Sequence, residues 1–148
     1  MLDILIISVG KKHDPLLASA IDHYENRIKH FAKLNWLLVP SSDISEESIG
    51  ISQKLKPGDT VVLLDETGKA VTNQDLARIV DAAQNQSAKR LVFIIGGAYG
   101  VDDALKAQAN DVVSLSGLVF PHQLVRLILV EQLYRSFSIL NGSKYHHE

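Results

Sequence analysis

The sequence contains no cysteine, which excludes disulfide bonds and every metal site built on thiolates. It also lacks a long apolar segment, because the run that begins at Leu2 stops at Gly10 and is too short to span a bilayer. No positively charged segment precedes that run, so it is unlike a signal peptide. We therefore expect a cytoplasmic protein with no membrane span.

An excess of positive charge is missing as well. Lys and Arg number 15 against 17 Asp and Glu, and the net charge is -2. This balance argues against a protein that binds RNA by bulk electrostatics alone, but it leaves room for a local basic patch. Small basic clusters lie at 11–13, 27–33 and 144–147, where most such clusters are simply solvated surface.

The sequence does have a regular alternation of apolar runs and helical patterns. Short runs rich in Val, Ile and Leu predict strands, and apolar residues three and four apart predict helices between them. We expect strands at 2–9, 36–39, 60–64, 91–95 and 112–115, and helices at 15–31, 44–55, 73–85, 102–109 and 121–140. This order predicts a single α/β domain over residues 1–148, with a mostly parallel five-stranded sheet and helices on both faces.

The last predicted helix is apolar on more than one side. Its apolar residues are Leu124, Val125, Leu127, Ile128, Leu129, Val130, Leu133, Tyr134, Phe137 and Ile139. A helix that is apolar on most sides must be covered on most sides. One layer can be the sheet of the same chain, and we predict that the other is a second subunit.

Three predicted strands end in unusual segments, at 64–69, 95–100 and 114–122. In open α/β sheets, ligands bind outside the carboxyl ends of the strands. The glycines of 96–100 would let backbone approach a ligand, although a tight strand-to-helix turn has the same pattern. The turn matches neither a dinucleotide fingerprint nor a Walker loop. The segment 115–120 could offer backbone groups to an adenine, or could be an ordinary loop.

Two residues of the last helix and the C-terminal tail are candidates for chemistry. His122 could accept a proton or simply cap the helix, and Arg126 could hold a phosphate or carboxylate or pair with Glu131. The tail 145–148 could be a frayed terminus, or could bind RNA through its Tyr and His side chains. Adjacent side chains diverge and no other cluster has ligand spacing, so we expect no metal site.

Together these segments resemble a known family. The resemblance rests on Leu64-Asp65-x-x-Gly68-Lys69, Ile95-Gly96-Gly97-x-x-Gly100, Ser114-Leu115-Ser116, Phe120-Pro121-His122-Gln123-Leu124-Val125-Arg126, Glu131-Gln132-Leu133-Tyr134-Arg135 and Tyr145-His146. In this order they are similar to the SPOUT-class pseudouridine N3-methyltransferases of large-subunit rRNA, the bacterial methyltransferase H family. The resemblance covers the whole chain and is most specific from Ser114 to Arg135.

The resemblance implies a fold and a cofactor that periodicity does not show. The fold would be the α/β trefoil knot, one of the rare exceptions to the rule that chains are unknotted. S-adenosyl-L-methionine (SAM) would bind in the knot, and the last helix would lie in a homodimer interface. The family's cofactor contacts correspond to Leu64, Gly96, Leu115, Ser116, Gly117, Leu118, Val119 and Phe120.

The resemblance also implies a substrate, a pseudouridine of large-subunit rRNA in the assembled ribosome. His146 would be the first candidate to accept the N3 proton and His122 the second, although water could also serve. Arg126, Tyr145 and His147 are candidate RNA contacts. Many family members have Arg or Lys at the position of His147, so a fixed cation is replaced here by a titratable group.

Three alternatives remain open from the sequence. A related knotted methyltransferase could act on tRNA or on another rRNA site. A non-enzymatic ribosome-binding factor could keep the same fold, in which case it would have no need of SAM. A small metallohydrolase could use the His-rich tail.

Overall fold

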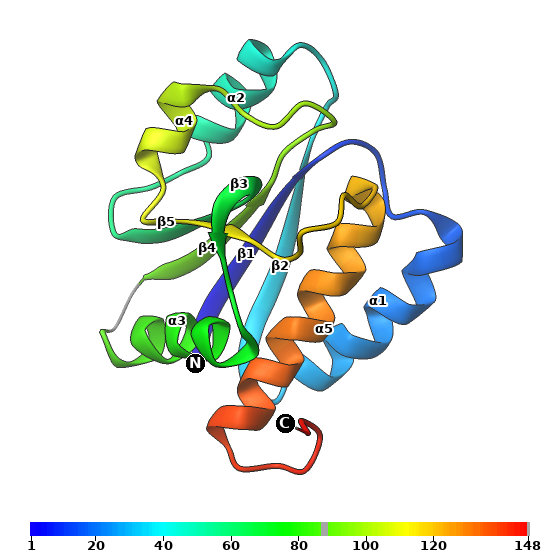
Figure 1. Cartoon of the computed structure of the whole chain (residues 1–148), viewed down its shortest axis with the longest axis vertical. Helices are drawn as coiled ribbons and strands as arrows, with labels where there is room; N and C mark the ends of the chain where they lie inside the picture. Colours follow the sequence, from blue (N-terminus) through cyan, green and yellow to red (C-terminus); the bar gives the residue numbers. More distant parts are fainter. Residues whose placement is uncertain (87–88, 148) are drawn as a thin grey trace.

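The computed structural model describes residues 1–86 and 89–147, which form alternating strands and helices (Figure 1). In chain order these are β1 (Leu2–Val9), α1 (Pro15–Ile28), β2 (Ala32–Val39), α2 (Ile44–Ser52), β3 (Asp59–Ala70), α3 (Asn73–Asn85), β4 (Arg90–Ile95), α4 (Asp103–Gln108), β5 (Asp111–Ser114) and α5 (His122–Leu140). The strands form one sheet in the order β2-β1-β4-β3-β5, and each neighbouring pair is parallel. The predicted α/β fold with a parallel five-stranded sheet is confirmed.

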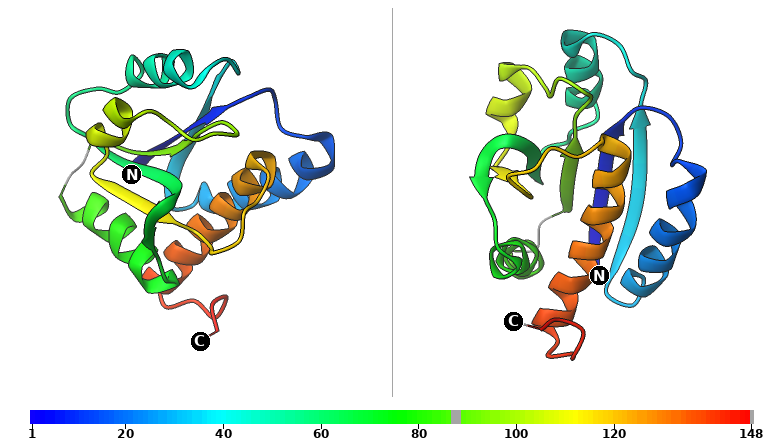
Figure 2. Two further views of the ribbon diagram at one scale, coloured as in Figure 1. Left: turned by 45° about the horizontal axis from the view of Figure 1, so that its top comes forward. Right: turned by 45° about the vertical axis from the view of Figure 1, so that its right-hand side comes forward.

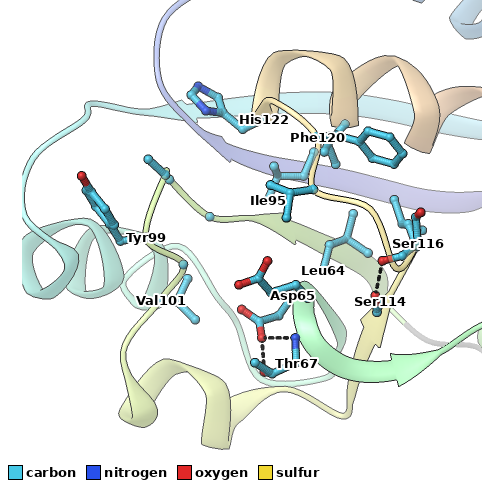
Figure 3. A pocket seen from close by; sticks show the side chains of 18 of the residues that line it. Leu64, Asp65, Thr67, Ile95, Tyr99, Val101, Ser114, Ser116, Phe120 and His122 are labelled. Atoms are coloured by element: carbon cyan, nitrogen blue, oxygen red, sulfur yellow. Dashed lines mark hydrogen bonds between the residues drawn. The ribbon is translucent and has the colours of Figure 1, made fainter.

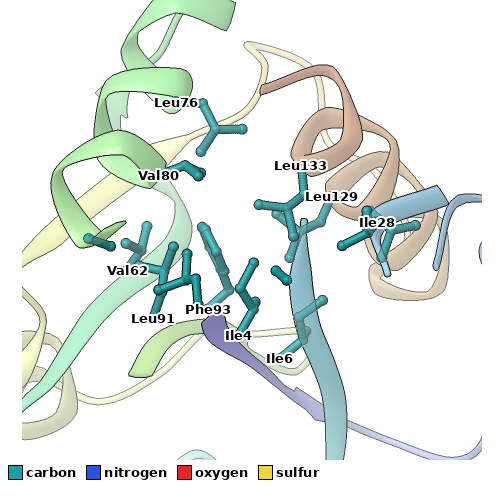
Figure 4. Packing of buried hydrophobic residues seen from close by; sticks show 14 of the residues in the cluster. Ile4, Ile6, Ile28, Val62, Leu76, Val80, Leu91, Phe93, Leu129 and Leu133 are labelled. Atoms are coloured by element: carbon teal, nitrogen blue, oxygen red, sulfur yellow. The ribbon is translucent and has the colours of Figure 1, made fainter. Parts of the chain in front are cut away.

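Strands β1 and β4 are apolar almost without interruption because both of their faces are buried. Along β1, Ile4 and Ile6 belong to a core that includes residues of α1, α3 and α5 (Figure 4). The alternate residues Leu5 and Ile7 belong to a second core, with residues of α2 and α4. A strand whose successive side chains enter two cores has no polar side to display. The helices therefore cover both faces of the sheet, as predicted (Figure 2).

Helix α5 lies against the sheet between α1 and α3 (Figure 1). Leu129, Leu133 and Phe137 are fully buried there. The chain itself thus covers more of this helix than the one layer expected from its sequence. Leu124 and Ile128 do not belong to this core and are only half-buried. The threading that would make the fold a knot stays a prediction from the resemblance.

Strand β3 is longer than its apolar run predicted. Residues Val62 to Leu64 pair with β5, and after a register shift Lys69 and Ala70 pair with it again. The intervening residues leave the ladder at the carboxyl end of the sheet. Gly68 allows the return, because a Cβ there would lie 2.7 Å from the Val112 backbone. This excursion carries polar side chains to the edge at which ligands bind.

Reciprocal hydrogen bonds fix the start of α3. The Thr72 hydroxyl accepts a hydrogen bond from the Asp75 N–H at 3.1 Å, and the Asp75 carboxylate accepts one from the Thr72 N–H at 2.9 Å. These two hydrogen bonds form a capping box at the start of α3, where the sequence predicted a helix from residue 73. Within the described residues, no helix is both long and apolar enough to cross a bilayer.

Candidate functional site

The carboxyl ends of β4, β3 and β5 surround a cavity of about 480 Å³ (Figure 3). Residues of all three segments that the sequence singled out after these strands line it, with His122 and Val125 of α5. Its volume lies within the range of about 300–1,000 Å³ that small-molecule and cofactor sites occupy. The rule that open α/β sheets bind ligands at their strand ends therefore located this cavity correctly.

The wall of the cavity after β5 is a loop that two serines hold in shape. The Ser114 hydroxyl donates to the Ser116 carbonyl at 2.9 Å, and the Ser116 hydroxyl accepts from the Leu118 N–H at 3.0 Å. Strand β5 ends at Ser114, one residue earlier than predicted, so the backbone from Leu115 onward is outside the ladder. Leu118 and Val119 are exposed on the rim. The loop can therefore offer backbone groups and apolar side chains to a ligand.

The wall after β4 is a tight glycine turn. The Gly100 N–H donates to the Gly97 carbonyl at 3.1 Å, and Gly100 has a φ of 81°, which favours glycine. A Cβ on Gly96 would lie 3.1 Å from Val101 Cγ1 and 3.2 Å from the Gly100 carbonyl carbon. The segment is thus a tight turn that also lines the cavity, and its close approach to a ligand stays a prediction.

Asp65 places a negative charge in the cavity (Figure 3). Its Oδ2 accepts hydrogen bonds from the Thr67 hydroxyl and from the Thr67 N–H, the latter at 3.0 Å, and lies 3.7 Å from Lys106 Nζ. Burial raises the pKa of Asp65, but the Thr67 hydrogen bonds and the Lys106 ammonium outweigh it and leave the pKa below its ordinary value. No role for Asp65 followed from the sequence, although an acid directly after a buried strand was the available signal.

The cofactor contacts implied by the resemblance gather in this cavity with one exception. Leu64, Gly96, Leu115, Ser116, Leu118, Val119 and Phe120 all line it. Gly117 belongs to the same loop but does not line the cavity, and a Cβ there would meet no atom within 4 Å. Of the two catalytic candidates, His122 also lines the cavity.

Arg126 is fully buried, with 0% of its surface exposed. Its Nε donates to Ser8 Oγ at 2.8 Å, Nη1 donates to the Lys11 carbonyl at 2.7 Å, and Nη2 donates to the Val9 carbonyl at 3.2 Å. It does not pair with Glu131, because Arg135 takes that carboxylate at 2.6 Å. Arg126 therefore ties α5 to the end of β1 in this structure, and it does not line the cavity.

The C-terminal tail lies at the other end of α5 (Figure 1). This helix has 19 residues and is therefore about 28 Å long. Tyr145 donates to Glu131 Oε1 at 3.0 Å, and His146 Nδ1 lies 3.1 Å from Arg135 Nη1. Burial, helped by Tyr24 and Glu131, raises the pKa of Tyr145. A single chain thus does not bring the tail to the cavity.

The rest of the tail adds no metal site to the described residues. His147 is exposed, and Glu148 lies outside the part of the chain that the structure describes. Among residues 1–86 and 89–147, no three or more His, Asp or Glu side chains are arranged to hold a metal ion.

A second cleft, of about 680 Å³, adjoins the first and was not foreseen from the sequence. It is lined by residues 41–45, Glu47, His122 and the turn 97–99. The two hollows share that turn and His122. Glu47 lies on the polar helix α2, where the pattern of polar and apolar residues did not indicate that this side chain is buried.

Comparisons with known proteins agree with this geometry. Residues 2–146 match the family model described as "Predicted SPOUT methyltransferase". Relatives from Bacteroides fragilis (strain ATCC 25285) and Geobacter sp. (strain M21), both named "Ribosomal RNA large subunit methyltransferase H", are 40% and 39% identical to this chain. Each alignment covers 97% of this chain, with 98% of the first relative and 97% of the second.

Two solved structures share the fold. The crystal structure of a probable methyltransferase from Bordetella pertussis Tohama I has a TM-score of 0.56 at 9% identity, over 90% of this chain and 95% of that one. A probable methylase family protein from Haemophilus influenzae Rd KW20 has a TM-score of 0.54 at 14% identity, over 96% of this chain and 67% of that one. At these identities the similarity shows the fold alone.

Proposed function

Since this chain belongs to the SPOUT methyltransferase family, we propose that it transfers the methyl group of SAM to N3 of a pseudouridine in large-subunit rRNA of the assembled ribosome. The observation that carries the proposal is the cavity at the ends of β3, β4 and β5. Seven of the eight residues that the resemblance assigns to the cofactor line it. Relatives of nearly equal length that are named for large-subunit rRNA support the choice of substrate.

The cavity suits the chemistry of SAM. Leu64, Ile95 and Phe120 give it an apolar lining for a flat adenine, and the loop 115–120 supplies backbone donors and acceptors for the polar edge of that base. Asp65 Oδ1 accepts no hydrogen bond from a described residue, so it is available to a ribose hydroxyl or an ammonium group. When bound, SAM supplies a methyl group on a positively charged sulfonium.

The chain's own residues would align the base and remove its proton. The N3 nitrogen must lose its hydrogen before or during attack on the methyl carbon, and a neutral imidazole can accept it. His122 lines the cavity and is the candidate that a single chain supplies. Holding the ring nitrogen and the methyl group in line is the larger task, because displacement depends on near-attack geometry.

A homodimer through α5 would make His146 available as well. The outward side of the helix carries the half-buried apolar residues Leu124 and Ile128, which a second copy could cover. If two copies of α5 pack antiparallel, the tail of one subunit lies near the start of α5 in the other. His146, Tyr145 and His147 would then face the cavity of the partner, where they could contact RNA. We also propose that the protein works in the cytoplasm, where bacterial ribosomes are found.

The proposed function is tested with purified protein, labelled SAM and ribosomes from cells that lack the endogenous methyltransferase. Intact ribosomes, free large subunits and naked rRNA are compared, and the label is mapped by nuclease digestion and mass spectrometry. Label on N3 of a large-subunit pseudouridine, obtained only with assembled ribosomes, is the expected result. SAM binding without label on any of the three would refute the substrate, and tRNA would be tried next.

A further inference from the structure

The second cleft lies beside the proposed SAM cavity and opens between two connections. One wall is the start of α2 with the residues before it, and the other is the turn after β4. Because the cleft and the cavity share Gly97, Ala98, Tyr99 and His122, a flat ligand in the cleft would have one edge next to a methyl donor in the cavity. The cleft is therefore placed to hold the molecule that receives the methyl group.

Glu47 gives this cleft one unpaired hydrogen-bond acceptor. The residue is only 6% exposed, and its Oε2 accepts a hydrogen bond from the Ser42 N–H at 2.9 Å. Oε1 accepts none from a described residue and lies against Gly97, where a Cβ would be 2.7 Å away. No fully buried polar side-chain atom among the described residues lacks a partner, so Oε1 reaches the open cleft. A nearly buried carboxylate oxygen in this position favours a ligand that offers an N–H group.

Tyr99 provides an aromatic surface at the same opening. It is 86% exposed, although it lines both hollows (Figure 3). Enzymes that modify a base within folded nucleic acid turn that base out of its stack, and commonly hold it against an aromatic side chain. Stacking of this kind does not depend on which base is bound. Tyr99 can therefore hold a base, but the choice among bases depends on Glu47, the polar group of the same cleft.

We propose that this cleft binds the target base, with Tyr99 stacked on it and Glu47 Oε1 accepting the N1–H of pseudouridine. The assignment rests on the proposed function. Pseudouridine is joined to its ribose through C5, so its N1 keeps a hydrogen; in uridine N1 carries the ribose and has none. N1 and N3 flank the same carbonyl carbon, so a base that gives N1–H to Glu47 can present N3 to the neighbouring cavity. Glu47 thus selects pseudouridine over uridine.

The substitution Glu47→Gln separates this role from a structural one. The Ser42 N–H requires an oxygen opposite it, so the amide carbonyl takes the place of Oε2 and the amide NH₂ faces the cleft. The variant keeps the shape and the hydrogen bond at the start of α2, but sets a donor against the N1–H donor. Glu46→Gln is the matched control, since it removes the same charge from the exposed neighbouring residue.

The experiment measures single-turnover methylation with excess enzyme on two kinds of ribosome. Both come from cells that lack the endogenous methyltransferase, and one kind also lacks the pseudouridine synthase, so that its target is uridine. The wild type should prefer pseudouridine. Glu47→Gln should slow the reaction on pseudouridine by about 10- to 100-fold, the scale of a lost hydrogen bond to a charged group. Its rate on uridine and its SAM dissociation constant by calorimetry should match those of Glu46→Gln.

Each other outcome has a separate meaning. A Glu47→Gln enzyme that keeps the wild-type rate on pseudouridine, or that loses the same factor on both targets, overturns the N1–H assignment. Equal wild-type rates on the two targets also overturn it and leave the methyltransferase function intact; this readout needs no variant to fold. A wild type that methylates neither kind of ribosome refutes the proposed function, and the assignment with it.

Discussion

Replacing Arg126 tests whether this residue stabilises the fold or binds the substrate. In Arg126→Ala, the carbonyls of Val9 and Lys11 and the Ser8 hydroxyl all lose their donor. A buried polar group left without a partner costs about 1–3 kcal/mol. Part of this cost is offset, because the variant no longer buries a guanidinium charge, and no carboxylate among the described residues pairs with that charge. We therefore expect a net loss of about 2–4 kcal/mol, a large share of the roughly 5–15 kcal/mol that stabilises a domain.

The assay is urea unfolding at neutral pH, followed by circular dichroism. The midpoint of Arg126→Ala should fall with little change in slope, since the unfolded surface is nearly unchanged. Arg78→Ala is the matched control: the Arg78 side chain is 71% exposed and among the described residues pairs with Asp75 alone, so the variant should unfold close to the wild-type midpoint. A wild-type midpoint for Arg126→Ala, together with a lower kcat/KM on ribosomes, would refute the structural role and restore Arg126 as an RNA contact.

Three further predictions concern the cofactor cavity and the dimer. Asp65→Asn should weaken SAM binding about tenfold by calorimetry. The affinity of the wild type should hold down to about pH 4, near the ordinary pKa of Asp, because the lowered pKa of Asp65 keeps its carboxylate charged. A loss of affinity already at pH 6 would contradict this role of the Asp65 charge. Gly97→Ala should reduce methylation, because its Cβ would lie 2.7 Å from Glu47 Oε1. Gly117→Ala should match the wild type, because a Cβ there would meet no atom within 4 Å. Equal methylation rates for the two variants would disprove the close approach of Gly97 to Glu47. Ile128→Glu should be a monomer by light scattering, because it places a charge on the outward side of α5. Ile49→Glu should remain a dimer, because Ile49 is exposed on α2. If both variants are dimers, α5 is excluded from the interface.

The sequence predicted best the strand that is buried on both faces. The bounds of β1 were predicted correctly because both faces of that strand enter a core, so the apolar run and the strand coincide. Strand β2 begins at Ala32, whereas the sequence predicted a start at Trp36. The first residues were missed because Lys33 and Asn35, which are exposed on this edge strand, interrupt the apolar run. The extension of β3 was missed for a related reason, since its polar end contains the register shift before Lys69.

The site was predictable in its location but not in all of its residues. Glycines and small residues after buried strands indicate a ligand edge, so the cavity followed from the order of the elements. Glu47 was not predicted, because its burial depends on Gly97, which is 50 positions away in the chain. Arg126 was expected to contact a ligand or a helix neighbour. Its three shortest hydrogen bonds go to Ser8, Val9 and Lys11, which lie 115 to 118 residues earlier, and no local pattern indicates them.

The position of Arg126 also explains why the site forms beyond the ends of β3, β4 and β5 and not beyond the end of β1. In a parallel sheet every carboxyl strand end is a possible ligand edge. Beyond the end of β1 that space holds the Arg126 guanidinium, which occupies the Val9 and Lys11 carbonyls. A Cβ on Gly10 would lie 3.2 Å from His122 Nε2 and 3.4 Å from Arg126 Nη2, so the start of α5 packs directly against this strand end. With β1 closed in this way, the ends of β3, β4 and β5 remain open, and the same packing sets His122 at the boundary of the two hollows.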